Sequence, residues 1–424
     1  MRVLIVNTSE RTGGAAVAAN RLMEALNNYG VKAKMLVRDK ESDSLTVAAL
    51  PGRWYQQWCF LWERLIVFLH LHCSRKHLFE VDIANAGTDI TRLREFQEAD
   101  VIHLHWINQG MLSLSGIRKI LQSGKPVVWT MHDIWPATAI CHYARDCKNY
   151  RTECRNCQLL SGHGGRHDLA NRVWKRKARM LADKSISYVA CSQWLCGEAK
   201  VSALLKGQKV ISIPNAINTH VFYPADKHQA CVRAGLPVDK KIILFVSQRV
   251  TDQRKGMDYL IAAVRILAET YPQLREQVGI AILGGHSEEL NDQLQFPVYS
   301  LGYVNNEQMI VNVYRSADVF VTPSLEDNLP NTIMESMACG VPCVGFKVGG
   351  IPEMIDHQKN GYVAAYRDAA DLARGLYWVL NEADSIGLCQ SAVAKVNRNY
   401  SQQSVALRYT EVYNEAIAQK NYKL

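Results

Sequence analysis

Long hydrophobic runs are missing from this 424-residue sequence, although 48% of its residues are apolar. A membrane-spanning helix needs about 20 consecutive apolar residues, and the most apolar segment, 53–79, is interrupted by Glu63 and Arg64. A cleavable export signal is also missing, because "MRVLIVN" runs into "TSERTGG" without a small-residue cleavage site. We therefore expect a cytoplasmic protein.

Cysteine is sparse outside one cluster, and no internal repeat is visible. Four of the twelve cysteines lie within 141–157, and the other eight are scattered. Cytosolic thiols stay reduced, so we expect the scattered cysteines to be small buried side chains rather than a disulfide framework. The absence of a repeat excludes a solenoid.

The formal net charge of +9 favours phosphate-bearing ligands, anionic lipid surfaces or nucleic acid without choosing among them. Segment 53–79 has the composition of a helix lying at an anionic membrane surface, or of a helix packed on its own domain. Its aromatic and basic residues are Trp54, Trp58, Trp62, Phe68, Arg75 and Lys76. The basic segment 171–180 predicts a solvated helix face.

Short β-branched runs alternate with helical patterns in two successive series, which predicts parallel βαβ units. The fold class is therefore α/β, with two Rossmann-like doubly wound domains facing across a deep cleft. We expect the first domain at 1–215 and the second at 216–403, with a turn-rich linker near 214–224. The apolar spacing in 404–424 predicts a helix that covers another surface. In such folds, ligands bind at the carboxyl ends of the strands.

The loop "FVSQRVTDQRKG" follows a predicted strand and carries Arg249 and Lys255. Arg offers a planar fork of donors and Lys a mobile charge, a combination that suits a diphosphate. The alternative is a pair of solvated surface charges. After a later strand, Gly349 and Gly350 allow the backbone to approach a ligand closely.

A second loop, "PSLEDNLPNTIMESMACG", precedes a predicted helix that Asn331 or Thr332 caps. The N-terminus of such a helix attracts phosphate. Glu335, one turn into the helix, is placed to accept a hydrogen bond from a ribose hydroxyl, and Asp327 faces what lies beyond the diphosphate. The alternative is a capping acid and a solvated acid.

The stretch 323–361 resembles the signature of the retaining glycosyltransferases of family 4, which have the GT-B architecture. In that signature one acid precedes a second by eight positions, and the second is followed by a small residue, "MA", any residue and Gly. Here Asp327 and Glu335 take these places, with the first acid shortened by one methylene. The resemblance implies that Asp327 contacts the donor sugar and Glu335 the nucleotide ribose.

The resemblance extends over most of the chain. "GGAAVAANRL" resembles the first-loop glycines that approach the donor diphosphate and the acceptor. "SIPNAINTHVFYP" resembles the interdomain stretch, and the C-terminal helix resembles one that crosses back onto the first domain. The implied roles assign the first domain to the acceptor side and the second to the donor. The implied donor-binding residues are Gly13, Gly14, Arg249, Lys255, Asp327, Asn328, Leu329, Asn331, Thr332 and Glu335. The implied catalytic residues are His132, Asp327, Arg249 and Lys255.

His132, in "VVWTMHDIWP", ends a predicted strand and resembles the family histidine that contacts the donor sugar near the reaction centre. The alternative is a polar loop histidine without a role. We expect Asp133 to orient His132. His103 and His105 alternate along a strand, so both lie on one side of it. We expect them to be structural or cleft-lining residues, with acceptor contact as the alternative.

The implied reaction moves a hexose-type sugar from a nucleoside diphosphate sugar to a growing glycan in cell-surface polysaccharide synthesis. We expect this acceptor glycan to be lipid-linked and to lie at the inner face of the membrane. The family retains anomeric configuration, and the leaving phosphate oxygen takes the acceptor proton. No catalytic cofactor is expected, because two cations replace a metal ion and no Asp-x-Asp ends a strand. Nucleic acid is not an expected partner. The alternatives are a nucleotide-sugar 2-epimerase of GT-B fold and a zinc-stabilised nucleic-acid-binding protein.

The cysteine cluster follows His132 in a loop. Five, six and two residues separate its cysteines, and the histidine-aspartate-x-tryptophan start with spaced cysteines resembles a subgroup that includes the colanic acid type. Only the last pair has a standard zinc spacing. We expect a closed structural zinc site that holds the loop of His132, with His142 as a spare ligand and unligated thiols as the alternative. The expected ligands are Cys141, Cys147, Cys154 and Cys157.

Overall fold

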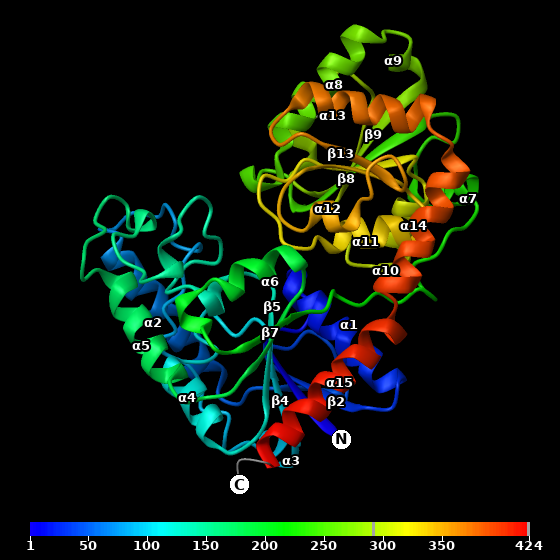
Figure 1. Ribbon diagram of the computed structural model, residues 1–424. Helices are drawn as coiled ribbons and strands as arrows, with labels where there is room; N and C mark the ends of the chain where they lie inside the picture. The colour runs from blue at the N-terminus through cyan, green and yellow to red at the C-terminus, as the bar shows by residue number, and fades with distance from the viewer. Residues whose placement is uncertain (291–292, 422–424) are drawn as a thin grey trace. The chain divides into compact units, whose positions relative to one another are not determined.

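A computed structural model describes residues 1–290 and 293–421. The chain forms two compact units, Met1–Ala216 with Val405–Leu424 and Ile217–Ser404 (Figure 1). Each unit is built around its own parallel sheet, which confirms the two predicted Rossmann-like domains. The C-terminal helix α15 (Gln402–Asn421) follows the second unit in sequence but packs in the first, as predicted.

The first unit has a seven-stranded sheet in the order β3-β2-β1-β4-β5-β6-β7, and every strand pair is parallel. Its strands are mostly short buried runs, as expected where helices cover both faces of a sheet. They are β1 (Arg2–Ser9), β2 (Lys32–Asp39), β3 (Val47–Ala49), β4 (Val101–Leu104), β5 (Val127–Met131), β6 (Ser187–Ala190) and β7 (Lys209–Ser212). The helices are α1 (Gly14–Asn28), α2 (Arg53–His70), α3 (Arg94–Glu98), α4 (Leu114–Gln122), α5 (Leu169–Leu181) and α6 (Gln193–Lys200).

The second unit repeats this plan with a six-stranded parallel sheet in the order β10-β9-β8-β11-β12-β13. Its strands are β8 (Lys241–Arg249), β9 (Val278–Gly285), β10 (Val298–Gly302), β11 (Val319–Thr322), β12 (Cys343–Phe346) and β13 (Gly361–Ala364). Its helices are α7 (Lys227–Ala234), α8 (Met257–Thr270), α9 (Leu274–Gln277), α10 (Glu307–Arg315), α11 (Asn331–Ala338), α12 (Ile351–Met354), α13 (Ala369–Tyr377) and α14 (Ser385–Asn399).

In the first unit the C-terminal helix α15 completes a hydrophobic core. Val405, Tyr409 and Tyr413 of α15 pack with residues of α1 and of the sheet. The Tyr413 hydroxyl lies 2.7 Å from His103 Nδ1, and the Tyr409 hydroxyl lies 2.8 Å from Thr130 Oγ1. The predicted apolar stripe of this helix therefore covers the sheet that carries the histidines.

The strand orders show where a ligand is expected in each unit. Strand order reverses between β1 and β4 in the first sheet and between β8 and β11 in the second. Helices leave such a switch point in opposite directions, and the crevice at the carboxyl ends of these strands is the usual ligand position. The predicted site residues follow β1, β5, β8 and β11, at or beside these positions.

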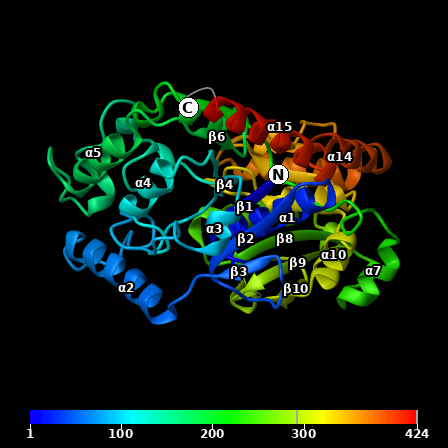
Figure 2. The same ribbon diagram turned by 90° about the horizontal axis from the view of Figure 1, so that it is seen from below.

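Helix α2 lies at the periphery of the first unit (Figure 2). Its buried residues include Gln56, Glu63 and Arg64, whereas most of its aromatic and leucine side chains are exposed. Over the residues that the structure describes, no helix combines the length and apolarity needed to cross a membrane.

Candidate functional site

The second unit brings a lysine and an acid together at its switch point. Arg249 is the exposed last residue of β8, and Lys255 ends the short 3₁₀ turn Gln253–Lys255 that follows. The Lys255 ammonium lies 2.6 Å from Asp327 Oδ2, on the loop after β11. Sequence reasoning assigned these two side chains to different parts of a donor, and the structure places them in direct contact.

Two glycines fix the backbone of the loop that carries Asp327. Gly256 has φ +71°, and a Cβ there would lie 1.9 Å from the Pro323 carbonyl oxygen. Gly349 has φ +55°, and its Cβ would lie 1.8 Å from the Asp327 carbonyl oxygen. Both positions therefore require glycine. The expectation that Gly349 lets the backbone approach a ligand stays a prediction, and its close neighbour in the structure is the Asp327 backbone.

Helix α11 begins at Asn331, as expected, but without the predicted cap. Pro330 is the N-cap residue and makes no side-chain capping bond, so Asn331 is the first helical residue rather than the cap. Proline has the extended conformation that this position requires, so the helix begins cleanly without an Asn331 or Thr332 cap. Glu335 lies one turn further on, is mostly buried, and accepts a 2.7 Å hydrogen bond from the Tyr314 hydroxyl of α10. That bond fixes the carboxylate while leaving acceptor capacity for a second donor.

In the first unit, two predicted glycines connect β1 to α1. Gly13 has φ +95° and is the N-cap of α1, and Gly14 is its first residue. Their place at the switch point is the one predicted for a loop that approaches a ligand. Donor contact by these glycines stays a prediction.

His132 follows β5 and is held by two other side chains. Its Nε2 lies 2.9 Å from His105 Nδ1, and its Nδ1 lies 3.5 Å from Cys191 Sγ. Burial lowers the pKa of His132 to about 4, although Asp133 opposes the shift. His132 is therefore a neutral imidazole near pH 7, able to exchange hydrogen bonds without carrying charge.

His103 and His105 lie on one side of the strand, with ring centroids 4.2 Å apart, as predicted. Burial lowers the pKa of His103 to about 3 and holds the pKa of His105 well below its ordinary value. His103 is fully bonded to Thr130 and Tyr413, a structural arrangement. His105 contacts His132, so it supports that residue directly.

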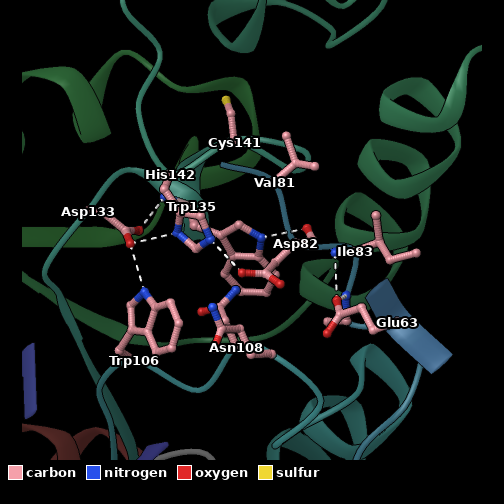
Figure 3. Close-up of polar contacts among 12 residues, drawn as sticks. Glu63, Val81, Asp82, Ile83, Trp106, Asn108, Asp133, Trp135, Cys141 and His142 are labelled. Atoms are coloured by element: carbon pink, nitrogen blue, oxygen red, sulfur yellow. Dashed lines mark hydrogen bonds and ion pairs between the residues drawn. The ribbon is translucent and has the colours of Figure 1, made fainter. Parts of the chain in front are cut away.

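Asp133 is hydrogen-bonded to residues other than His132. Its Oδ2 accepts hydrogen bonds from Trp106 Nε1 at 2.9 Å and from His142 Nδ1 at 2.7 Å (Figure 3). Its Oδ1 accepts one from the Trp135 amide at 2.9 Å. The prediction that Asp133 orients His132 is therefore wrong, because His132 is oriented by His105 and Cys191.

His142 lies between two carboxylates, which excludes it as a spare zinc ligand. Its other ring nitrogen, Nε2, lies 2.6 Å from Asp82 Oδ2 (Figure 3). Burial alone would lower its pKa, but Asp133 and Asp82 outweigh that effect and raise the pKa of His142 to about 10. Both nitrogens carry protons and donate, so neither has a lone pair for a metal.

The same network continues into helix α2. Asp82 also accepts from the buried Arg64 guanidinium, which donates to the Leu78 carbonyl at 2.6 Å and the Val81 carbonyl at 3.1 Å. Glu63 Oε1 accepts from the Ile83 amide at 2.8 Å (Figure 3) and from the Ala84 amide at 2.6 Å. Burial and the nearby Asp82 raise the pKa of Glu63 to about 7. Ionic contacts thus connect α2 to the loop that follows His132.

The cysteine-bearing loop is anchored by backbone pairing and by a buried lysine. Val81 and Cys141 form an antiparallel bridge. Lys177 of α5, predicted on a solvated face, is instead buried and donates to the Trp135 carbonyl at 2.7 Å and the Thr138 carbonyl at 3.0 Å. Burial lowers the pKa of Lys177 to about 7.

All four cysteines of the loop are free thiols. Burial, together with the neighbouring thiols, raises the pKa of Cys141, Cys154 and Cys157. Within 1–290 and 293–421, no three His, Cys, Asp or Glu side chains are arranged to hold a metal ion. The zinc prediction therefore has no support from the structure.

Sequence reasoning missed the network of His142, Asp82 and Arg64, and the burial of Lys177. His142 and Asp82 are 60 residues apart. No local pattern predicts such a pair. The one available signal was two adjacent charged residues, Glu63 and Arg64, inside an otherwise apolar helix.

Comparisons with known proteins identify the family. Residues 12–221 match a model described as Glycosyltransferase Family 4, and residues 240–382 match one described as Glycosyl transferases group 1. The two matches cover most of both units, whose paired parallel sheets form the GT-B fold. The chain belongs to the family 4 glycosyltransferases.

Two curated relatives are similar at the level of sequence. A D-inositol 3-phosphate glycosyltransferase from Thermobispora bispora is 27% identical over 50% of this chain and 51% of its own length. An uncharacterized glycosyltransferase from Methanocaldococcus jannaschii is 27% identical over 84% of this chain and 97% of its own length. The chain thus spans about half of the first relative and nearly all of the second.

Two solved structures share the fold. Sucrose-phosphate synthase from Thermosynechococcus elongatus has a TM-score of 0.67 at 18% identity, with 99% of each chain covered. HepE from Anabaena, in complex with UDP and glucose, has a TM-score of 0.64 at 15% identity, with 98% of this chain and 100% of that chain covered. Identity this low supports the fold alone.

Proposed function

We propose that this glycosyltransferase moves a hexose-type sugar from a nucleoside diphosphate sugar to a growing glycan, with retention of anomeric configuration. The second unit is the donor side and the first the acceptor side. One observation carries the proposal: Lys255, Asp327 and Glu335 come from separate loops and a helix, and all lie at the switch point of one sheet. That arrangement supplies a cation for a diphosphate and a fixed carboxylate for a ribose.

The leaving diphosphate is stabilised by charge that the fold already holds in place. Arg249 approaches it from the end of β8 and Lys255 from the turn that follows, and the N-terminus of α11 adds its positive dipole end. Preorganised donors of this kind usually form the largest single catalytic term. When a diphosphate binds, Lys255 exchanges part of its contact with Asp327 for the phosphate oxygens. Asp327 then becomes available to the donor sugar.

His132 acts as an uncharged hydrogen-bonding partner of the donor sugar. Its lowered pKa keeps the imidazole neutral at pH 7, and His105 and Cys191 hold the ring. A protein base is not required, because the leaving phosphate oxygen takes the acceptor proton. Two protein cations serve where other transferases use a metal ion.

The acceptor in this proposal is a lipid-linked glycan of cell-surface polysaccharide synthesis, of the exopolysaccharide type. The support is the start of the loop "HDIW" with its spaced cysteines, and the net charge of +9. A basic protein concentrates near anionic lipid surfaces, where such acceptors are anchored.

Removing the Glu335 carboxylate tests the donor site. Glu335→Ala is expected to weaken nucleotide-sugar binding by about 10- to 100-fold, because a hydrogen bond to a charged group contributes about 1.5–3 kcal/mol. Titration calorimetry with the best-bound donor of a nucleotide-sugar panel measures the change.

Glu307→Ala is the matched control for this test. Glu307 is an exposed acid at the start of α10, the helix that also carries Tyr314. The control should bind the donor as the wild type does. Donor affinity that is equal in Glu335→Ala and wild type would remove Glu335 from the site.

Structural zinc at Cys141, Cys147, Cys154 and Cys157 stays a prediction from spacing alone. Elemental analysis of protein purified without chelators is expected to find about one zinc per chain, as in closed four-cysteine sites. The variant Cys154→Ser with Cys157→Ser should lose it, whereas Cys231→Ser should not. Metal-free wild-type protein would disprove the site.

A further inference from the structure

Helix α2 has the reverse of the usual polarity for a surface helix. A surface helix normally turns its apolar stripe to the core and its charged face to water. In α2 the buried residues are Gln56, Cys59, Glu63, Arg64 and Val67, so polar and charged side chains make up most of the buried side. The exposed side is an unbroken apolar stripe at helical spacing: Trp54, Tyr55, Trp58, Leu61, Trp62, Leu65 and Leu69. We call these seven residues the α2 stripe.

The α2 stripe is exposed to an unusual degree. Trp54 is 84% exposed and Leu61 63% exposed. The aromatic members stack along the helix, with ring centroids of Trp58 and Trp62 5.7 Å apart and those of Tyr55 and Trp58 6.0 Å apart. Contiguous exposed apolar surface of this kind marks an interaction site, whereas single exposed apolar residues need no explanation.

The orientation of α2 is fixed, so the stripe cannot turn inward. Glu63 is bonded to the amides of Ile83 and Ala84, and Arg64 is bonded to Asp82. On the same side the backbone of Phe60 packs so closely on Gly110 that a Cβ at Gly110 would lie 2.5 Å from the Phe60 amide nitrogen. Rotating the helix would leave buried charges without partners.

Charge around the α2 stripe indicates the kind of surface that it meets. The stripe itself contains no charged residue, and exposed basic residues flank both of its ends. Arg53 precedes the stripe, Arg75 and Lys76 follow the helix, and the exposed Arg172 of α5 lies 3.1 Å from His70 at the helix end. The nearby acid Glu80 is paired with Arg145 and His77.

This combination matches an in-plane helix at a bilayer surface better than a protein interface. Tryptophan and tyrosine are enriched at the level of lipid headgroups, where one part of the ring is wet and another apolar. Flanking Arg and Lys side chains add attraction to anionic headgroups. We propose that the α2 stripe and its flanking basic residues form a binding surface for an anionic lipid bilayer.

Binding to vesicles tests the proposal without any assay of sugar transfer. Full-length protein is expected to float with vesicles of equal parts phosphatidylcholine and phosphatidylglycerol, and more weakly with phosphatidylcholine alone. Trp54→Ser with Trp58→Ser and Leu61→Ser should reduce partitioning on the order of tenfold or more, because binding scales with buried apolar area. Arg75→Glu with Lys76→Glu should reduce it for the anionic vesicles only.

The matched control replaces three exposed apolar residues of the second unit: Val232→Ser, Tyr303→Ser and Ile386→Ser. It should float as the wild type does, and circular dichroism should show that all variants are folded. The proposal would be overturned if the wild type did not bind vesicles, or if the α2 variant bound them as strongly as the wild type does. A third outcome would also overturn it: neither protein binds vesicles, and sedimentation shows a dimer of the wild type but not of the α2 variant. The α2 stripe would then be an interface between two copies of the chain. The α2 variant should bind the nucleotide sugar with the affinity of the wild type. Failure of the membrane proposal and failure of the donor-site proposal can therefore be distinguished.

Discussion

Lys255→Ala is expected to lower kcat for sugar transfer by about 10²- to 10³-fold, the range found when one preorganised donor to a developing negative charge is removed. We propose that the Lys255 ammonium, at the end of the short turn after β8, stabilises the departing diphosphate. The same substitution leaves Asp327 without its 2.6 Å partner. Release of nucleoside diphosphate under saturating donor measures the effect.

Two variants make this result specific. Lys255→Arg keeps the positive charge and should recover much of the rate, although an Arg fork fits a lysine site imperfectly. Arg254→Ala removes the neighbouring cation, which is paired with Asp252 at 2.8 Å, and should change kcat by less than about threefold, as expected for a partly exposed pair. Equal losses in Lys255→Ala and Arg254→Ala would indicate a disturbed loop rather than a catalytic lysine.

His142→Ala is expected to destabilise the first unit by about 3–5 kcal/mol, the usual result of removing one partner from a buried ion pair. The variant leaves Asp82 and Asp133 facing each other without the cation between them. Urea unfolding followed by tryptophan fluorescence is suited to the measurement, because eight of the nine tryptophans belong to the first unit.

The destabilisation should depend on pH in a defined direction. The pKa of His142 is raised from 6.5 to about 10, so its contribution is fully present below pH 6.5 and is lost as pH rises towards 10. Lys177, whose pKa is lowered to about 7, acts in the opposite direction over this range. Lys177 is present in both the wild type and the His142→Ala variant, so its effect cancels in the difference between them. The difference in unfolding free energy between wild type and His142→Ala is therefore expected to shrink from pH 6.5 to pH 10.

His167→Ala, which alters an exposed histidine of the same unit, is the control for these measurements. It should match the wild type at every pH. A His142→Ala variant within about 1 kcal/mol of the wild type at pH 6.5 would show that the two carboxylates do not depend on His142.

The fold followed from local sequence patterns for physical reasons. Buried parallel strands are short β-branched runs, and runs such as "RVLIVN" and "KIILFVSQR" are bounded by glycine-rich or polar loops. The resulting strand order placed the loops of Arg249 and Asp327 at a switch point. Residue positions along the chain were thus enough to place both loops at the carboxyl ends of strands, but not to predict the contact of Lys255 with Asp327.

Side-chain partners were less predictable, because they depend on contacts between distant segments. Sequence adjacency suggested that Asp133 orients His132, yet Asp133 is held by Trp106 and His142. The Asn331 cap failed because the preceding proline already sets the backbone where the helix begins. In both cases a tertiary or backbone constraint outweighed the local pattern.

Helix α2 shows the same limit. Its sequence predicts a helix, and its period is visible, but the side that faces the core depends on Asp82 and on the amides of residues 83 and 84. Those partners lie at least 18 residues from Arg64 and Glu63. An apolar stripe alone is normally assigned to the core. The structure reverses that assignment.

We propose that the second unit binds a nucleoside diphosphate sugar without a metal ion. Titration calorimetry of the wild-type protein with UDP-, GDP-, ADP- and dTDP-hexoses, in the presence of EDTA, tests it most directly. At least one donor is expected to bind with a dissociation constant of about 1 μM to 1 mM, the range common for enzyme substrates. That binding should be lost in the double variant Lys255→Ala with Glu335→Ala. Binding of no donor, or binding that EDTA abolishes, or binding that the double variant retains, would contradict the account.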